Sequence, residues 1–415
     1  MVASVWDRIL DRAARAGSAT VVIGDSGERV DAAAVVARAE ALASGLHGHG
    51  IGPGTVVMWQ VPVGVDAVLV MLALARLGAT QVPLAEDAGG REARALARTT
   101  GAELVLTAAA DTGPGRTLWI ETMHAAPRVL RLEDEITADR AAACPPGPVA
   151  AGRWIFPGTG TAGARYGVRH TDATLLAAAN GLARCGLRPA PGGVLASTHS
   201  PGTVAGVVYQ LSAIVAGVPL LPIREANPAH VVGVLRHFGV TIAAVSPELR
   251  AELVRMQRAL PRTSVLLPEL RMLRCWGEPH SPRLHRAAEE ELGTVVARDY
   301  GTPEFPLVTV SVPADSSGTP SAHGADRPIP GLRVRIATGD HEVRAGVPGE
   351  IQVFGRDLSG GHADPAHRER VFTADGWFRT GDRGRLDVSG ALTVLGKQGG
   401  RLGSLRARAV SRPST

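Results

Sequence analysis

A segment rich in glycine and threonine is the first part of this sequence whose residue types could do chemistry. It reads Gly158-Thr159-Gly160-Thr161-Ala162-Gly163 and follows a short apolar stretch, Trp154-Ile155-Phe156, that is typical of a strand. Backbone N–H groups and threonine hydroxyls in such a turn can bind phosphate oxygens. The segment also fits the G-x-G-x-x-G pattern, so a dinucleotide site has to be considered as well.

The residues that follow argue against both common nucleotide-binding motifs. A dinucleotide site needs a helix that starts at the third glycine and an acidic residue about 20 positions later. Residues 164–168 are typical of a loop or strand, and no Asp or Glu occurs between Asp172 and Glu225. A P-loop needs Lys and then Ser or Thr after the last glycine, where Ala164 and Arg165 stand. A phosphate-binding turn of another kind remains, with a plain tight turn as the alternative.

Further motifs occur downstream of this turn. They are Gly277-Glu278-Pro279, Tyr300-Gly301-Thr302-Pro303-Glu304, Pro348-Gly349-Glu350-Ile351-Gln352-Val353, Gly376-Trp377-Phe378-Arg379-Thr380-Gly381-Asp382 and Gly396-Lys397. Together with the turn they resemble the motifs of the adenylate-forming ligases, the superfamily of acyl-CoA synthetases, luciferases and adenylation domains. The segment that ends at Asp382 matches that family's Gly-Trp-(Phe/Tyr)-x-Thr-Gly-Asp signature at every fixed position. Because the motifs stand in family order and spacing, the resemblance covers nearly the whole chain.

The resemblance implies a phosphate end of the site. The turn would bind the phosphates of ATP, and Glu304 would bind Mg²⁺, which prefers hard oxygen ligands beside phosphates. The catalytic group would consist of Glu304, Arg165 and Tyr166. The residues of the turn expected to contact the nucleotide are Thr159, Gly160, Thr161 and Gly163.

It also implies a nucleoside end and an acyl pocket. Tyr300 would offer its ring to adenine, and Asp382 would accept hydrogen bonds from both ribose hydroxyls. Lys397 would reach the ribose or a phosphate as a point charge. His199 would line the acyl pocket. The remaining nucleotide contacts are expected from Gly277, Glu278, Pro279 and Gly301.

The sequence departs from the family pattern where activity would be most sensitive. Tyr166 replaces the lysine of the phosphate loop, Arg165 replaces the preceding proline, and Pro303 replaces a threonine. Lys397, the only lysine in the chain, stands where the family has arginine at its hinge. The chain stops at Thr415, about where the family's C-terminal lid, which carries a second lysine, would begin. Because a lost transition-state charge stabiliser lowers a rate by about 10²–10³-fold, we expect slow or absent unaided adenylation.

Three hypotheses for the function follow. The first is the core of an acid–thiol or acyl-AMP ligase that binds ATP or an acyl-adenylate, Mg²⁺ and a carboxylic acid. Its partners would be CoA or a phosphopantetheinyl carrier protein, or a separate lid-bearing protein, and a homodimer is left open. The second is a non-catalytic relative that serves as a scaffold or nucleotide sensor. The third is a repurposed catalyst of ATP-independent acyl transfer that uses Tyr166, although no G-x-S-x-G nucleophile motif supports it.

Composition argues against several other classes of protein. The net charge of +5 comes from dispersed arginines with few aromatic residues to stack bases, so no nucleic-acid partner is expected. No apolar run of about 18 residues occurs, and Met1–Gly17 is typical of an amphipathic helix, not of a signal peptide. We therefore expect a cytoplasmic protein without a membrane span. Three scattered cysteines, Cys144, Cys185 and Cys275, predict neither a disulfide framework nor a metal site.

The elements that would position these residues follow from hydrophobic spacing. A helix, a glycine stop and a β-rich strand recur over residues 67–84, 91–107 and 229–245, which is typical of an α/β domain with a largely parallel sheet. After about residue 307, paired strands around turns at 338–340 and 388–390 predict an all-β module. In the acyl region, small residues predict room for a bulky acid: Gly202, Gly206 and Ala213.

We therefore predict an α/β fold made of two related α/β subdomains with mostly parallel sheets and a smaller distorted β-barrel subdomain. The first α/β subdomain would span residues 1–150. The second, with the phosphate loop and the adenine site, would span 151–306. The barrel-like subdomain would span 307–396, and residues 397–415 would form a truncated hinge and tail.

Overall fold

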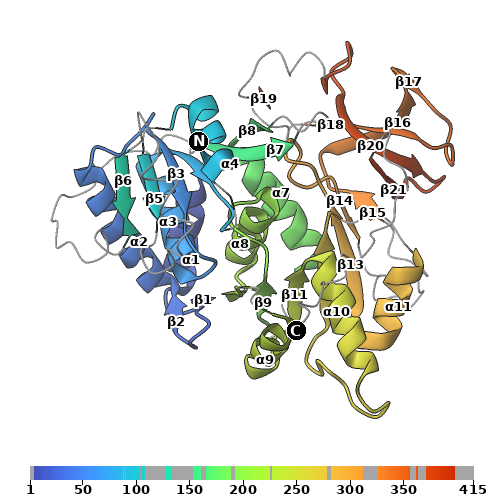
Figure 1. The fold of residues 1–415 in the computed structure, drawn as a ribbon, viewed down its shortest axis with the longest axis horizontal. Helices are drawn as coiled ribbons and strands as arrows, with labels where there is room; N and C mark the ends of the chain where they lie inside the picture. The colour runs from blue at the N-terminus through green and yellow to red at the C-terminus, as the bar shows by residue number, and fades with distance from the viewer. Residues whose placement is uncertain are drawn as a thin grey trace, which may run out of the picture.

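The computed structural model of the chain contains two β-sheets with helices packed against them (Figure 1). In the part of the chain that the structure describes, one sheet has 14 strands and the other has seven. The predicted α/β class with large, mostly parallel sheets is confirmed. The described residues are 4–86, 88, 90–102, 104–107, 128–132, 153–159, 165–187, 192–224, 227–277, 282–311, 326–355, 361–362 and 371–397.

The seven-stranded sheet contains the glycine-rich hairpin. Its strands are β3 (Val56–Gln60), β4 (Thr80–Pro83), β5 (Leu104–Thr107), β6 (Arg128–Arg131), β7 (Arg153–Thr159), β8 (Arg165–Thr171) and β19 (Gly361–His362). They lie in the order β19-β8-β7-β4-β3-β5-β6, and every pair from β7 to β6 is parallel. β8 turns back antiparallel along β7, and β19 pairs with its outer side. The hairpin therefore extends one side of a parallel sheet.

The larger sheet changes from parallel to antiparallel along its width. Its strands are β1 (Thr20–Ile23), β2 (Arg29–Asp31), β9 (Leu195–Ser197), β10 (Leu220–Pro222), β11 (Ile242–Val245), β12 (Met272–Trp276), β13 (Val295–Tyr300), β14 (Thr309–Ser311), β15 (Asp326–Pro328), β16 (Leu332–Thr338), β17 (His341–Glu342), β18 (Gly349–Gly355), β20 (Phe378–Leu386) and β21 (Leu392–Lys397). The order is β17-β16-β18-β20-β21-β15-β14-β13-β12-β11-β9-β10-β1-β2. In this spatial order, each strand between β13 and β1 is parallel to its neighbour. Each strand between β17 and β13 is antiparallel to its neighbour.

The helices begin and end where local chemistry favours it. They are α1 (Val5–Ala16), α2 (Ala32–Gly48), α3 (Val65–Leu77), α4 (Gly90–Thr100), α7 (Asp172–Gly186), α8 (Val204–Ala216), α9 (Pro228–His237), α10 (Pro247–Arg258) and α11 (Pro282–Leu292). Several start at a residue whose side chain accepts a hydrogen bond from the first turn: Ser4, Asp31, Thr171, Thr203, Asn227 and Ser246. Residues 67–75 of α3 are all buried, so this helix lies inside the main core.

The antiparallel part of the large sheet is open. The two predicted hairpins are present, one joining β16 to β17 and one joining β20 to β21. Within the described residues, however, these strands continue the parallel core through β15 and β14, so they do not close into the distorted barrel expected from the sequence. β14 pairs with β15 on one edge and with β13 on the other, so it has no free edge with which to close a barrel.

The two sheets do not divide at the expected boundary near residue 150. β1 and β2 come from the first 150 residues but belong to the large sheet, where β1 pairs with β10. β7 and β8 come after residue 150 but belong to the seven-stranded sheet. β19 also belongs to the seven-stranded sheet, although β18 and β20 on either side of it belong to the large one. The chain therefore crosses between the sheets four times, and the limits of the three subdomains stay a prediction.

One buried arginine joins the N-terminal helix to the end of α8. Arg12 on α1 donates from Nη1 to the carbonyl oxygens of Ala213 at 3.1 Å and Val218 at 3.4 Å, and from Nη2 to that of Thr20 at 2.6 Å. These acceptors include carbonyl groups at a helix C-terminus, which lack partners within the helix. Burial lowers the pKa of Arg12 to about 10.

We expect Arg12→Met to lower the free energy of unfolding by about 2–3 kcal/mol, because it removes buried hydrogen bonds to the carbonyl oxygens of Ala213, Val218 and Thr20. Arg15→Met is the matched control: this arginine is exposed and bonds only to Asp11 of its own helix, so its loss should cost less than about 0.5 kcal/mol. Urea unfolding of the two variants measures the difference. Equal stabilities would contradict a structural role for Arg12.

Candidate nucleotide and acyl site

The structure brings together three of the residues predicted to bind the nucleotide. Tyr300, the last residue of β13, donates its hydroxyl hydrogen to Oδ2 of Asp382 at 2.8 Å. Lys397, the last residue of β21, places Nζ 2.8 Å from Oδ1 of the same carboxylate. Asp382 lies on β20 directly opposite Lys397 in the antiparallel register. Both oxygens of Asp382 thus have donors, one from each neighbouring segment.

Burial differs sharply among these three side chains. Tyr300 is 9% exposed and Asp382 is 6% exposed, whereas the Lys397 side chain is 70% exposed. Burial and then the charge of Asp382 raise the pKa of Tyr300 well above 10, so the phenol stays protonated as a donor. The result is a buried carboxylate that accepts a hydrogen bond from a buried phenol and pairs with an exposed ammonium group.

The Thr-Gly-Asp signature has a local structural reason. Oγ1 of Thr380 donates to the carbonyl of Ile351 at 2.8 Å and accepts from the backbone N–H of Asp382 at 3.0 Å. Gly381 between them has φ of 66°, a left-handed conformation that residues with a Cβ rarely adopt. Threonine and glycine together set the backbone that presents the Asp382 carboxylate to Tyr300.

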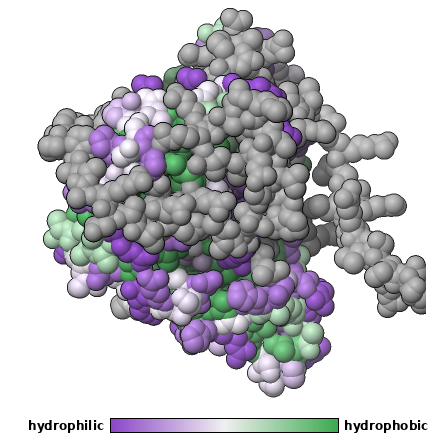
Figure 2. Space-filling model, turned by 60° about the vertical axis from the view of Figure 1, so that its left-hand side comes forward, coloured by the Kyte–Doolittle hydropathy of each residue, from purple (hydrophilic) through white to green (hydrophobic). Residues whose placement is uncertain are grey.

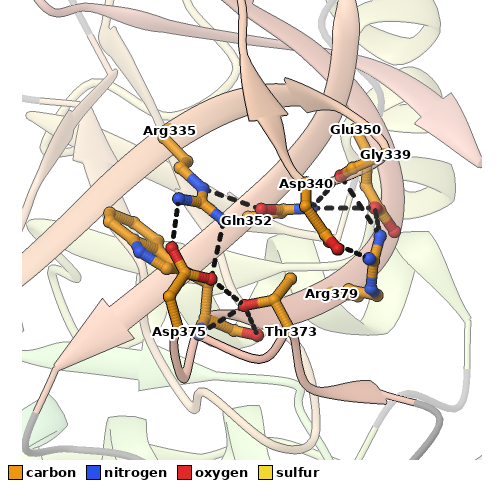
Figure 3. Close-up of polar contacts among 9 residues, drawn as sticks. Arg335, Gly339, Asp340, Glu350, Gln352, Thr373, Asp375 and Arg379 are labelled. Atoms are coloured by element: carbon orange, nitrogen blue, oxygen red, sulfur yellow. Dashed lines mark hydrogen bonds and ion pairs between the residues drawn. The ribbon is translucent and has the colours of Figure 1, made fainter.

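A polar network on the neighbouring strands supports the turn before β20 (Figure 3). Arg335 on β16 donates to Asp375 at 2.7 Å and to Gln352 at 2.8 Å. Its guanidinium also lies 4.5 Å from the ring centroid of Trp377. Contacts with Arg335 and then Thr373 lower the pKa of Asp375 to about 2.

The same network holds the arginine of the signature. Arg379 on β20 pairs with Glu350 at 3.0 Å and also with Asp340 in the turn after β16 (Figure 3). Trp377 and Arg379, which the signature contains without an assigned role, therefore anchor β20 to β16 and β18. They position Asp382 and do not themselves reach it.

The loop after Tyr300 depends on a close backbone approach. A Cβ on Gly301 would lie 2.6 Å from the carbonyl oxygen of Pro306, so only glycine fits there. Glu304, three residues later, is 4% exposed, and its charge contributes to the raised pKa of Tyr300. The structure thus places the residue predicted to bind magnesium close to the predicted adenine residue.

His170 ties the glycine-rich hairpin to this loop. Its Nε2 lies 2.6 Å from the carbonyl oxygen of Pro303, and its Nδ1 lies 3.1 Å from Oγ1 of Thr174. Burial lowers the pKa of His170 to about 4, so the ring is neutral near pH 7. A carbonyl oxygen can only accept, so Nε2 carries the proton. The sequence indicated no role for this residue, because its partner is 133 positions away.

Acidification is expected to destabilise the fold between pH 6.5 and about 4. Burial lowers the pKa of both His170 and His199 from 6.5 to about 4. The unfolded chain binds those protons first, so stability present above pH 6.5 is lost as the pH falls. Asp326 acts in the opposite sense, because burial raises its pKa from 3.8 to about 6. The stability lost through the two imidazoles exceeds the stability gained through the one carboxyl group. The net loss in the free energy of unfolding is on the order of a few kcal/mol.

His170→Gln tests this pH dependence. Glutamine keeps an N–H that can reach the carbonyl of Pro303 but does not titrate, so the slope of the unfolding free energy below pH 6.5 should fall by about 1.4 kcal/mol per pH unit. His237→Gln replaces an exposed histidine and should leave the slope unchanged. Urea unfolding from pH 4.5 to 7.5 measures both variants. Parallel slopes would show that the buried imidazole does not control acid stability.

The glycine-rich turn itself lies partly outside the described residues. The backbone of the hairpin is described up to Thr159 on β7 and from Arg165 on β8, where these two residues are register partners. A strand thus follows the third glycine where a dinucleotide motif needs a helix, so rejection of that motif is confirmed. The phosphate contacts predicted from the turn stay predictions: Thr159, Gly160, Thr161, Gly163, Arg165 and Tyr166. Gly277 directly follows β12, and Glu278 and Pro279 lie outside the described residues.

A second cluster lies next to Tyr300, and we call it the acyl cluster: His199, Tyr209, Arg274, Trp276 and Asp299. Tyr209 on α8 donates to Oδ2 of Asp299 at 2.6 Å, and Nε of Arg274 donates to the same oxygen at 2.9 Å. Arg274 also pairs with Oδ1. The ring of His199 stacks on Tyr209 with centroids 5.1 Å apart, and Trp276 meets Tyr209 edge-on at 5.7 Å. The sequence had singled out His199 by number, and it placed the other pocket residues only on the segments 199–213 and 276–302.

The small residues of the acyl region do not leave space. A Cβ on Gly202 would lie 2.0 Å from the backbone nitrogen of Ala85, and one on Gly206 would lie 2.0 Å from the carbonyl oxygen of Ser200. Their prediction as room for a bulky acid is therefore wrong, because both glycines permit close contacts between backbone segments. Ala213 is fully buried in α8.

Comparison with known proteins identifies the family. Residues 9–362 match the AMP-binding enzyme family. The chain belongs to this family. It is 27% identical to a salicyl-AMP ligase / salicyl-S-ArCP synthetase of Mycobacterium tuberculosis, over 94% of the chain and 72% of that protein. It is 33% identical to an indoleacetate–CoA ligase of Aromatoleum aromaticum over 35% of the chain, a match that spans only 28% of that enzyme's length.

A solved structure has a similar fold. It is the O-succinylbenzoate coenzyme A synthetase of Bacillus subtilis in complex with ATP and magnesium ion. The TM-score is 0.81 at 18% sequence identity, over 94% of this chain and 79% of that one. At this identity the likeness concerns the fold, which is that of an AMP-binding enzyme.

The described part of this AMP-binding family member contains neither a metal-binding cluster nor a membrane-spanning helix. Among the described residues, no group of three or more His, Cys, Asp or Glu side chains is arranged to hold a metal ion. None of the described helices has the length and apolar character needed to cross a membrane. Cys275 is buried in the core and forms no disulfide.

Proposed function

We propose that this chain binds ATP or an acyl-adenylate together with a carboxylic acid and serves in acyl activation. In that reaction a carboxylate oxygen of the acid attacks the α-phosphorus of ATP, and pyrophosphate leaves. The observation that carries the proposal is the buried Asp382 carboxylate, held by Tyr300 and capped by Lys397. An anchored carboxylate of this kind suits the two adjacent hydroxyls of a ribose, which are hydrogen-bond donors.

The phosphates would lie toward the glycine-rich hairpin. The bond between His170 and Pro303 links that hairpin to the loop that carries Glu304. A Mg²⁺ ion bound by Glu304 would take its other ligands from the phosphates and water, as this ion commonly does. Arg165 and Tyr166 are proposed to contact the phosphates from β8, in place of a lysine.

The acyl group would then pass to a thiol. One relative is a CoA ligase and another a synthetase that forms a thioester with a carrier protein. We therefore propose CoA or a phosphopantetheinyl carrier as the acceptor, with a lid from this or another chain closing the site.

Exchange of radioactive pyrophosphate into ATP, measured over a panel of carboxylic acids with Mg²⁺, tests the proposal. The assay is run on the chain alone and with added carrier or lid-bearing proteins. Exchange that depends on an acid supports acyl activation. No exchange under any of these conditions would contradict it.

Nucleotide binding without turnover is the second candidate function. It is favoured by Tyr166, which stands at the position of the family lysine. Calorimetric binding of AMP or ATP in the absence of exchange would support it. Release of pyrophosphate by the purified chain would reject it.

A further inference from the structure

In the acyl cluster the charged side chains are fully buried, and the partly exposed side chains are aromatic rings. The side chains of Arg274 and Asp299 are 0% exposed. His199 and Trp276, by contrast, are only partly buried. A ligand that reaches this cluster therefore meets the imidazole and the indole, because the ion pair has no exposed surface.

The sealed charges are already satisfied by one another. Arg274 contacts both oxygens of Asp299, and Tyr209 adds a third donor at 2.6 Å. Taking one partner of a buried pair away from the other is strongly unfavourable. Asp299 is thus not free to bind an ammonium group of a ligand, and Arg274 is not free to bind a second carboxylate.

The imidazole of His199 offers a hydrogen-bonding atom. Its Nε2 is buried and has no hydrogen-bond partner among the described residues. Burial lowers the pKa of this ring to about 4, so it is neutral at physiological pH. A neutral imidazole nitrogen can donate or accept one hydrogen bond, according to its tautomer. Buried polar atoms normally have partners, so an orphaned one indicates a place for a ligand group.

The cluster lies where a ligand of this fold is expected. His199 follows the end of β9, Trp276 is the last residue of β12, and Asp299 precedes the last residue of β13. These three strands run parallel in one sheet, so their carboxyl ends share an edge, which is where open α/β sheets bind ligands. Tyr300, next to Asp299, contacts Asp382, so the cluster adjoins the proposed nucleotide site.

We infer that the acyl site takes a planar aromatic carboxylic acid whose other substituents are uncharged, with one of them hydrogen-bonded to Nε2 of His199. The flat ring packs against Trp276 and the imidazole, and the acid's own carboxylate points toward the nucleotide. Amino acids and dicarboxylic acids are rejected, because their additional charge would be buried without a partner. This inference rests on the proposed function and names its substrate class.

Equilibrium binding to the full chain tests the inference without requiring turnover. Calorimetry, with and without AMP, compares benzoate, its three hydroxy isomers, terephthalate and 4-(aminomethyl)benzoate. The best hydroxybenzoate should bind about 3–10-fold more tightly than benzoate, as expected for one neutral hydrogen bond. Terephthalate and 4-(aminomethyl)benzoate should bind at least about 100-fold more weakly than benzoate.

His199→Phe separates the hydrogen bond from the packing. Phenylalanine preserves a ring over Tyr209 but lacks Nε2, so the preference for the hydroxybenzoate should disappear while benzoate affinity changes by less than about 3-fold. His237→Phe replaces an exposed histidine and should leave both affinities unchanged. General damage to the fold would weaken the binding of benzoate and of the hydroxybenzoate alike, so the ratio of the two affinities reports on Nε2 alone.

The inference is overturned if terephthalate or 4-(aminomethyl)benzoate binds more tightly than benzoate. It is also overturned if no aromatic acid binds, or if the affinity ratio survives in His199→Phe. Pyrophosphate exchange with the same acids distinguishes the two proposals. The expected binding order without exchange rejects acyl activation only, whereas exchange that is fastest with a dicarboxylic or amino acid rejects the substrate class only.

Discussion

Asp382→Asn is expected to weaken AMP binding by about 10–100-fold. The amide has the size of the carboxylate and keeps one oxygen for Tyr300, but it loses the charge and one of the two acceptors proposed for the ribose. Loss of a hydrogen bond to a charged group costs about 1.5–3 kcal/mol. Pyrophosphate exchange that depends on the carboxylic acid substrate should fall by at least the same factor, since the nucleotide must bind before it can react.

Asp11→Asn is the matched control for this variant. Asp11 is an exposed carboxylate on α1 whose side chain pairs with Arg8 of the same helix, so the same chemical change there should leave AMP affinity unaltered. Isothermal titration calorimetry measures AMP binding to both proteins. If Asp382→Asn binds AMP as tightly as the unchanged chain, the nucleotide does not use this carboxylate, and the proposed site is wrong.

Arg274→Met should lower the free energy of unfolding by about 3–5 kcal/mol. Arg274 and Asp299 form an ion pair in which both side chains are 0% exposed, and removing the cation leaves an unpaired carboxylate in the core. Tyr209 alone would then donate to Asp299. The double variant Arg274→Met/Asp299→Asn should recover much of the loss, because the remaining amide is neutral and still accepts from Tyr209.

An exposed pair provides the comparison for this second prediction. Arg255 and Glu252 form an ion pair on the surface of α10, where solvent screens the charges, so Arg255→Met should leave the free energy of unfolding nearly unchanged. Urea unfolding of the single and double variants gives the free energies. A double variant as unstable as Arg274→Met alone would mean that lost packing, and not an unpaired charge, causes the destabilisation.

The sequence by itself determined the family, the α/β class and the local elements. Helices with a glycine stop and hairpins with a tight turn depend on residues a few positions apart, so residues 67–84 and the turns at 338–340 and 388–390 could be predicted. The motif ending at Asp382 could be recognised for the same reason. Its threonine and glycine set the backbone locally, and the spacing of such a motif is visible in a single chain.

Only the tertiary structure decided which distant residues meet. The contacts between Tyr300 and Asp382, Arg274 and Asp299, and His170 and Pro303 span 82, 25 and 133 positions. No local preference encodes these pairs, because each depends on which strands become neighbours in a sheet. The open form of the antiparallel module follows from pairing of β13 with β14, and Gly202 serves backbone packing with a segment more than a hundred positions away. Buried polar groups must find partners wherever the fold places them, so the sequence supplies the groups and strand pairing selects the partners.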